Sequence, residues 1–137
     1  MDILESCINY LTDRNIPVTS NNKGAYFEFE GISFYLVYPF EGGQVVQIFA
    51  CDVLKLNKRN RSKALWEINK LNCDMNYADI KIGIMDFYVL VFSEAVISEE
   101  SDIGKLSTLT VSMHKATTEI RKQMKRRRGK KRRLIKE

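Results

Sequence analysis

The chain has 137 residues, 45% of them hydrophobic and 28% charged, which is the composition of a single globular domain. No eighteen apolar residues run together, and no basic segment precedes an apolar run near Met1, so we expect neither a membrane span nor a secretory signal. The three cysteines, Cys7, Cys51 and Cys73, lie far apart in apolar patterns. We therefore expect reduced core thiols without a disulfide, and a cytoplasmic protein.

The net charge of +5 is divided unevenly along the chain. Residues 1–120 contain 11 Lys and Arg against 16 Asp and Glu, a net charge of −5. Residues 121–137 contain 11 Lys and Arg against one Glu, a net charge of +10. The sequence thus predicts a single acidic domain over 1–120 and a basic C-terminal tail over 121–137 that continues the last helix.

The N-terminal part of the chain shows one helical pattern and three strand patterns. The first helix is predicted by apolar residues at spacings of three and four, namely Ile3, Leu4, Cys7, Ile8 and Leu11. Pro17 ends this helix, because the residue before a proline is pushed out of helical geometry. Strands are predicted over 26–30, 32–38 and 44–54, with a turn at Glu30-Gly31. Because short turns join them, we expect an antiparallel meander.

The central part of the chain combines a helix with a hairpin. Over 59–73 the sequence predicts a helix that packs on the sheet through the stripe Ala64, Leu65, Ile68, Leu71 and Met75. Alternation over 80–84 and an apolar run over 87–92 predict two strands joined by a turn at Met85-Asp86.

A last helix is predicted from about Ser98, with acidic residues in its first turn and a long apolar stripe. Gly129 is its expected end, because glycine favours helix C-termini. Its stripe is Ile103, Leu106, Leu109, Met113, Ala116, Ile120 and Met124.

The segment 68–72, Ile-Asn-Lys-Leu-Asn, followed by a polar loop and paired strands, resembles the YbjN family, whose fold is that of the type III secretion chaperones. The similarity covers most of residues 1–120 and rests on apolar positions and two asparagines. It implies an α+β fold consisting of a helix, a three-stranded antiparallel meander, a helix, a two-strand hairpin and a long C-terminal helix. It also implies a protein that holds another protein or peptide on its sheet or helix face, and a homodimer.

No catalytic or metal-binding motif is evident. His114, the only histidine, lies in the last predicted helix. A carboxylate or cysteine that could act with it would have to lie one helical turn away, but threonines, Thr117 and Thr118, occupy those positions. The cysteines form no C-x-x-C pair, and no glycine-rich phosphate-binding motif occurs. We expect no catalytic residue, cofactor or metal site, and no enzymatic activity.

Basic residues form two candidate anion-binding groups. The weaker group, Lys58, Arg59, Arg61 and Lys63, lies at the start of the central helix, where a solvated loop is the favoured alternative. The stronger group, the tail, offers contacts for nucleic acid, an anionic lipid surface or an acidic protein, and self-docking on the acidic domain is an equal alternative. Its candidate contacts are Arg121, Lys122, Lys125, Arg126, Arg127, Arg128, Lys130, Lys131, Arg132 and Arg133.

Trp66 and Asn69 on the central helix are candidate interface residues. Asn69 and Asn72 have a second interpretation, which we favour, in which their amides anchor the loop after the helix. The first functional hypothesis is a non-enzymatic protein- or peptide-binding module, chaperone-like or regulatory. The alternative is a nucleic-acid-associated protein that binds phosphates through its tail.

Overall fold

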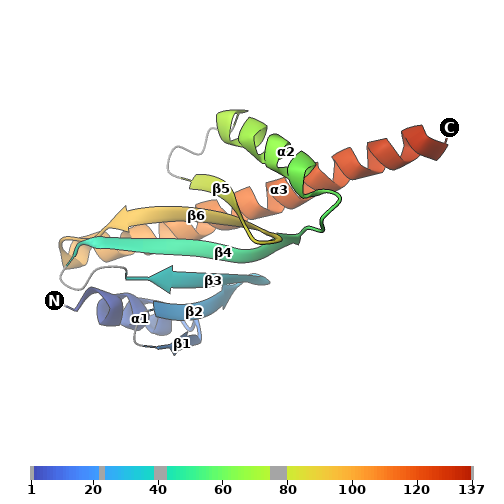
Figure 1. Ribbon diagram of the computed structural model, residues 1–137. Helices are drawn as coiled ribbons and strands as arrows, with labels where there is room; N and C mark the ends of the chain where they lie inside the picture. Colours follow the sequence, from blue (N-terminus) through green and yellow to red (C-terminus); the bar gives the residue numbers. More distant parts are fainter. Residues whose placement is uncertain (1, 22–23, 39–42, 75–79, 137) are drawn as a thin grey trace.

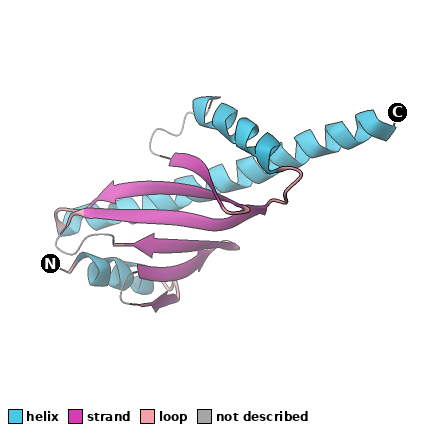
Figure 2. Ribbon diagram, in the orientation of Figure 1, coloured by secondary structure: helices cyan, strands magenta, loops and turns pink. Residues whose placement is uncertain are grey.

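In the computed structural model, which describes residues 2–21, 24–38, 43–74 and 80–136, a six-stranded antiparallel sheet packs against helices (Figures 1 and 2). The strands lie in the order β1-β2-β3-β4-β6-β5. The elements along the chain are α1 (Ile3–Asp13), β1 (Val18–Ser20), β2 (Gly24–Phe29), β3 (Ile32–Val37), β4 (Val45–Lys55), α2 (Arg61–Asp74), β5 (Ile80–Met85), β6 (Tyr88–Val96), the 3-10 helix η1 (Glu100–Gly104) and α3 (Lys105–Lys136). The predicted α+β fold and its order of elements are confirmed.

The first helix and the first strand are set by short-range signals. The side chain of Asp2 caps α1 by accepting a hydrogen bond of 3.1 Å from the backbone N–H of Glu5. After α1, Asn15 takes a positive φ of 63°, which turns the chain into β1. The strand β1 was not predicted, because its three residues are too few and too polar to show an alternating pattern.

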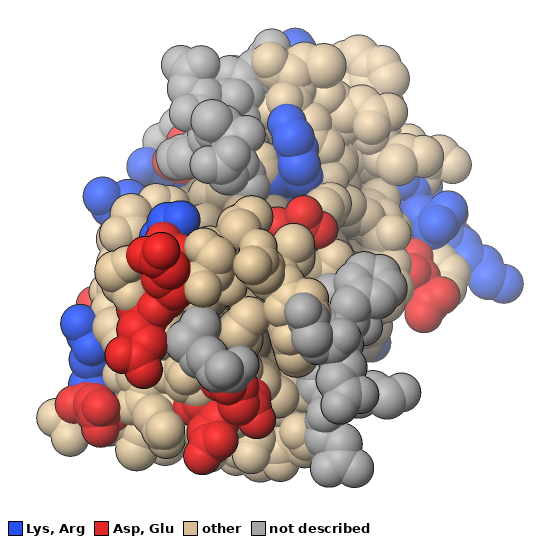
Figure 3. All heavy atoms as spheres, turned by 90° about the vertical axis from the view of Figure 1, so that its left-hand side faces the viewer, with Lys and Arg blue, Asp and Glu red and all other residues tan. Residues whose placement is uncertain are grey.

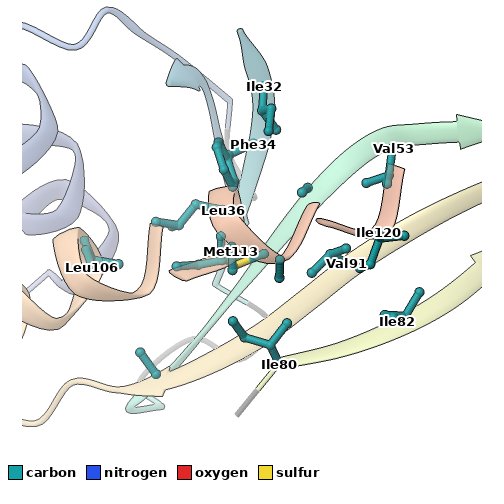
Figure 4. Packing of buried hydrophobic residues seen from close by; sticks show 14 of the residues in the cluster. Ile32, Phe34, Leu36, Val53, Ile80, Ile82, Val91, Leu106, Met113 and Ile120 are labelled. Carbon is teal, nitrogen blue, oxygen red and sulfur yellow. The ribbon is translucent and has the colours of Figure 1, made fainter. Parts of the chain in front are cut away.

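One face of the sheet forms the hydrophobic core against α1, α2 and α3. Alternate residues of the strands, such as Phe34 on β3, Ile48 on β4 and Val91 on β6, are buried there. Figure 4 shows Met113 and Ile120 of α3 lying among the buried side chains of these strands. The helix α1 lies over β1 and β2, α3 over β4 and β6, and α2 beside β5 (Figure 1).

The last helix differs from its prediction at both ends. Its acidic first turn forms η1, and the α-helix proper starts at Lys105. Gly129 does not end it, since α3 continues to Lys136. The residues after Gly129 are mostly Lys and Arg, good helix formers that also complement the C-terminal dipole, and they outweigh the cost of one glycine of about 1 kcal/mol.

The buried stripe of α2 is narrower than predicted. Ala64, Ile68 and Leu71 are buried, but Leu65 is 46% exposed. Leu65 is wrongly placed in the predicted stripe because each helical residue rotates by about 100°, which carries its side chain off the face that Ala64 and Ile68 share. Met75, the last predicted member, lies outside the described residues.

None of the three cysteines is in a disulfide, as expected, but they are not all in the core. Cys7 is buried, Cys51 is half-buried and Cys73 is exposed. The prediction of a core position for Cys73 is wrong, because Cys73 lies on the side of α2 that faces away from the sheet.

Candidate functional site

The face of the sheet opposite the core carries no helix among the described residues, and in Figure 1 it faces the viewer with α1 and α3 behind it. We call it the open face. Its side chains are the alternate residues of β2 to β6 that point away from the helices. They include Tyr26, Glu28, Tyr35, Gln47, Phe49, Lys81, Leu90, Phe92 and Glu94, all half-buried or exposed.

Aromatic residues in adjacent strands stack across the open face. On β2 and β3, the rings of Tyr26 and Tyr35 lie 4.1 Å apart between centroids, at an interplanar angle of 13°. On β4 and β6, the rings of Phe49 and Phe92 lie 6.1 Å apart at 29°. Such cross-strand aromatic pairs stabilise the sheet.

A hollow of about 340 Å³ lies on the open face where β4, β6 and β5 run side by side. Its lining includes Phe49, Gly83, Leu90, Phe92 and Glu94. Sequence reasoning missed this hollow. The signal for it was the run over 87–92, which is apolar on both faces and so supplies more apolar side chains than the core needs.

The outer side of α2 is a second exposed surface. Trp66 is 65% exposed there, next to the half-exposed Leu65 and the exposed Asn69, and the ammonium of Lys70 lies 5.8 Å from the Trp66 ring centroid. Trp66 therefore does not cap the core.

The two asparagines of α2 have different positions. The amide of Asn72 donates to the carbonyl oxygen of Ile82 and accepts from its N–H, both at 2.9 Å, so it holds α2 to β5. Asn69 is exposed instead. Asn72 therefore has a structural role, as the favoured interpretation expected, but it anchors β5 itself, since the loop over 75–79 lies outside the described residues.

The weaker basic group lies around the turn that leads into α2, and Asn57 holds the backbone of this turn. The side chain of Asn57 accepts hydrogen bonds from the N–H groups of Arg59 and Asn60, at 2.9 and 3.0 Å. Arg61 is turned toward the β5–β6 turn, where its Nε donates to the carbonyl oxygen of Asp86 at 3.0 Å. Lys58 and Lys63 are exposed. The structure therefore favours the solvated-loop alternative over a preformed anion site.

Arg121, the first residue of the basic tail, faces the body. Its Nε donates a hydrogen bond of 2.8 Å to the carbonyl oxygen of Val53, at the irregularity in the pairing of β4 with β6. Lys122 is exposed, and Met124 is 2% exposed within the core. For the other candidates, Lys125, Arg126, Arg127, Arg128, Lys130, Lys131, Arg132 and Arg133, the side chains lie outside the described part of the structure.

Charge is separated along the length of the molecule. The backbone of α3 continues beyond the sheet as a helix, so the basic segment projects away from the body (Figure 1). Acidic side chains are visible at the opposite end of the molecule (Figure 3). The starts of α1 and η1, two elements in contact with each other, carry Asp2, Glu5, Glu99 and Glu100. A straight α3 holds the basic segment away from this acidic end of its own chain.

His114 lies at the edge of the core rather than in a reactive cluster. Its Nε2 is 3.2 Å from the carbonyl oxygen of Glu30 and 3.7 Å from the Glu30 carboxylate, and the ring meets Phe29 edge-on at 5.7 Å. Within the described ranges, no group of three or more His, Cys, Asp and Glu side chains is arranged to hold a metal ion. No helix in the same ranges is both long and apolar enough to span a membrane.

Solved structures with the same arrangement exist. YbjN from E. coli, a candidate transcription regulator, superposes with a TM-score of 0.64 and 8% identity over 90% of this chain and 93% of its own. The Yersinia pestis type III secretion chaperone SycH, in complex with a stable fragment of YscM2, superposes with a TM-score of 0.58 and 12% identity over 84% of this chain and 96% of its own.

Comparison of the sequence with family models and curated proteins gives no match. Both structural neighbours are described as a regulator or a chaperone and not as enzymes. The chain therefore has the YbjN-like, type III secretion chaperone-like fold, as its sequence predicts.

Proposed function

We propose that the chain is a non-enzymatic protein- or peptide-binding module, chaperone-like or regulatory, and that the open face is its binding surface. The observation that carries this proposal is the uncovered half of the sheet, where Phe49, Leu90 and Phe92 line a hollow. Burial of exposed apolar and aromatic side chains is the main driving force for protein association. SycH, whose structure contains a fragment of YscM2, supports a polypeptide as the ligand of this fold.

The test is affinity capture from the native cell with matched variants. Leu90→Lys places a charge in the hollow, and Val111→Lys places the same charge on α3, where Val111 is 39% exposed. We expect the same partner to be captured by the unmodified chain and by Val111→Lys but lost with Leu90→Lys. Equal capture by both variants would show that the partner binds elsewhere.

We propose nucleic-acid association as a second function, supported by the projecting basic segment of α3. Contacts to phosphates would make binding nearly independent of sequence and steeply dependent on salt, with a log–log slope of about −0.9 per contact on duplex DNA. Charge reversal of Arg126, Arg127 and Arg128 should lower both the affinity and the slope more than charge reversal of Lys58 and Arg59. Absence of salt-sensitive binding at low ionic strength would exclude this function.

We further propose that the outer side of α2 mediates a homodimer. Trp66 and Leu65 leave large apolar side chains exposed there, and tryptophan is enriched at interface centres. Sedimentation equilibrium should show a dimer that Trp66→Ala weakens and Val111→Ala does not. A monomer at all concentrations would contradict this assembly.

A further inference from the structure

On the wall of the hollow formed by β5 and β6, a glycine lies beside two large apolar side chains. Gly83 pairs with Leu90, and Phe92 comes next to it on the same face. A Cβ atom at position 83 would lie 3.2 Å from Cε1 of Phe92. The Phe92 ring thus lies close against the bare backbone of Gly83, and a side chain at this position would crowd the ring at the edge of the hollow.

One carboxylate stands at the rim of the hollow. Glu94 is exposed, and its Oε1 accepts a hydrogen bond of 3.0 Å from Nε2 of Gln47, its cross-strand neighbour. That bond restrains the carboxylate. Within the part of the chain that the structure describes, Glu94 has no salt bridge. The hollow thus combines two aromatic rings with an anionic group that has no cationic partner in these residues.

This combination suits a group with an apolar stem and a flat cationic head. We propose that the hollow binds an arginine side chain carried by an extended peptide of a partner protein. The methylene groups would pack between Phe92 and Leu90, and the guanidinium would stack on Phe49 or Phe92 and hydrogen-bond Glu94. Arginine fits better than lysine, because its planar head can stack on a ring and bind a carboxylate through two N–H groups at once.

This inference rests on the proposed function, because it names the chemistry of the ligand that the open face takes. The carboxylate of Glu94 favours a basic ligand by charge complementarity. A volume of about 340 Å³ leaves room for one long side chain and part of the adjoining peptide.

The test uses two five-residue peptides with blocked ends, in which valine and threonine alternate around a central arginine or its neutral analogue citrulline. Binding to the full chain is followed by NMR through the backbone N–H of Gly83 and the side-chain amide of Gln47. We expect the arginine peptide to bind about three- to tenfold more tightly than the citrulline peptide.

Three variants locate the preference. Glu94→Gln can keep a hydrogen bond to Gln47 and should abolish the preference for arginine. Glu28→Gln removes the same charge from the β2 part of the open face and should leave it unchanged. Gly83→Ala narrows the hollow and should weaken both peptides, with the melting temperature as a check on folding.

Equal binding of the two peptides, failure of both to bind, or a preference that survives Glu94→Gln would overturn the arginine pocket. If both peptides bind equally and shift the NMR signal of the Gly83 N–H, peptide binding at the open face stands and only the preference for arginine fails.

Occupation of the hollow by a second copy of this chain would also overturn the proposal. In that case an arginine from the basic tail of one copy would enter the hollow of another. The NMR signal of the Gly83 N–H would then shift with protein concentration in the full chain, and this dependence would vanish when residues 125–137 are removed.

Discussion

The two faces of the sheet are made by the same strands, yet they differ in what covers them. On the core face, Phe34, Ile48 and Val91 are at most 1% exposed beneath the helices. On the open face, Phe49, Leu90 and Phe92 remain half-buried with no helix of the described chain above them. Apolar residues alone therefore do not mark the core of this protein. The position of the helices decides which apolar face becomes the core and which remains available for a partner.

The largest expected effect contrasts one phenylalanine from each face. Phe34→Ala empties a fully enclosed site and should destabilise the protein by about 3–5 kcal/mol. Phe92→Ala removes a ring that is stacked but half-buried, so we expect a loss of about 0.5–1.5 kcal/mol. Urea denaturation measures both values, and similar losses would mean that the open face is covered in solution.

The same contrast holds around α2. Ile68 is 2% exposed, so Ile68→Ala should destabilise the protein by about 2–5 kcal/mol. Leu65→Ala should change stability by less than about 0.5 kcal/mol, because Leu65 lies on the outer side of the helix. A loss below about half a kcal/mol for Ile68→Ala would show that α2 packs through another side.

Truncation tests where α3 stops covering the core. The domain ending at residue 120 should still unfold cooperatively, but it lacks Met124 and the hydrogen bond from Arg121 to Val53. We therefore place the end of the folded domain at Met124 and expect 1–124 to be more stable than 1–120 by about 2–4 kcal/mol. Calorimetry of the two fragments measures the difference in their stability. Equal stability would show that the folded domain ends at Ile120.

A smaller effect is expected at the junction of α2 and β5. Asn72→Ala leaves the N–H and carbonyl of Ile82 without the amide that binds both, so we expect a loss of about 1–3 kcal/mol. Asn69→Ala removes an exposed amide and should change stability by less than about 0.5 kcal/mol. Equal effects in denaturant titrations would contradict the different placement of the two side chains.

The least perturbing test uses the three native cysteines. Burial raises the pKa of the Cys7 thiol on α1 to about 12, so almost none of it is the reactive thiolate at neutral pH. Native-state alkylation followed by mass spectrometry should modify exposed Cys73 first, half-buried Cys51 on β4 more slowly, and Cys7 only on unfolding. Early modification of Cys7 would show that α1 opens readily.

Periodicity predicted the fold well because long elements repeat their pattern several times. It placed Met113, Ile120 and Met124 on one stripe of α3, and all three are buried. It failed where the signal was short or depended on neighbours in space. Three residues cannot reveal β1, and a helical pattern one position too wide included Leu65.

The open-face hollow could not be predicted for a related reason. It requires Gly83, Phe92 and Glu94 to meet across β5 and β6. The residue pattern of one strand alone does not predict which strand it pairs with or in which register. The tail was visible in the sequence as a charge run. Its first member, Arg121, nevertheless binds Val53, 68 residues earlier in the chain, and no local pattern indicates that contact.

The two edges of the sheet bear on how this protein avoids polymerising. An exposed strand edge is a template on which another chain can add a strand, and a sheet with an apolar face is especially prone to such growth. Here β1 offers an edge of only three residues, and on β5 the amide of Asn72 occupies the backbone groups of Ile82. Both edges are thus poor sites for intermolecular sheet extension. A ligand of the proposed open-face site would then be recognised through side chains, where its sequence matters. It would not be recognised through backbone pairing, to which nearly any extended chain could contribute.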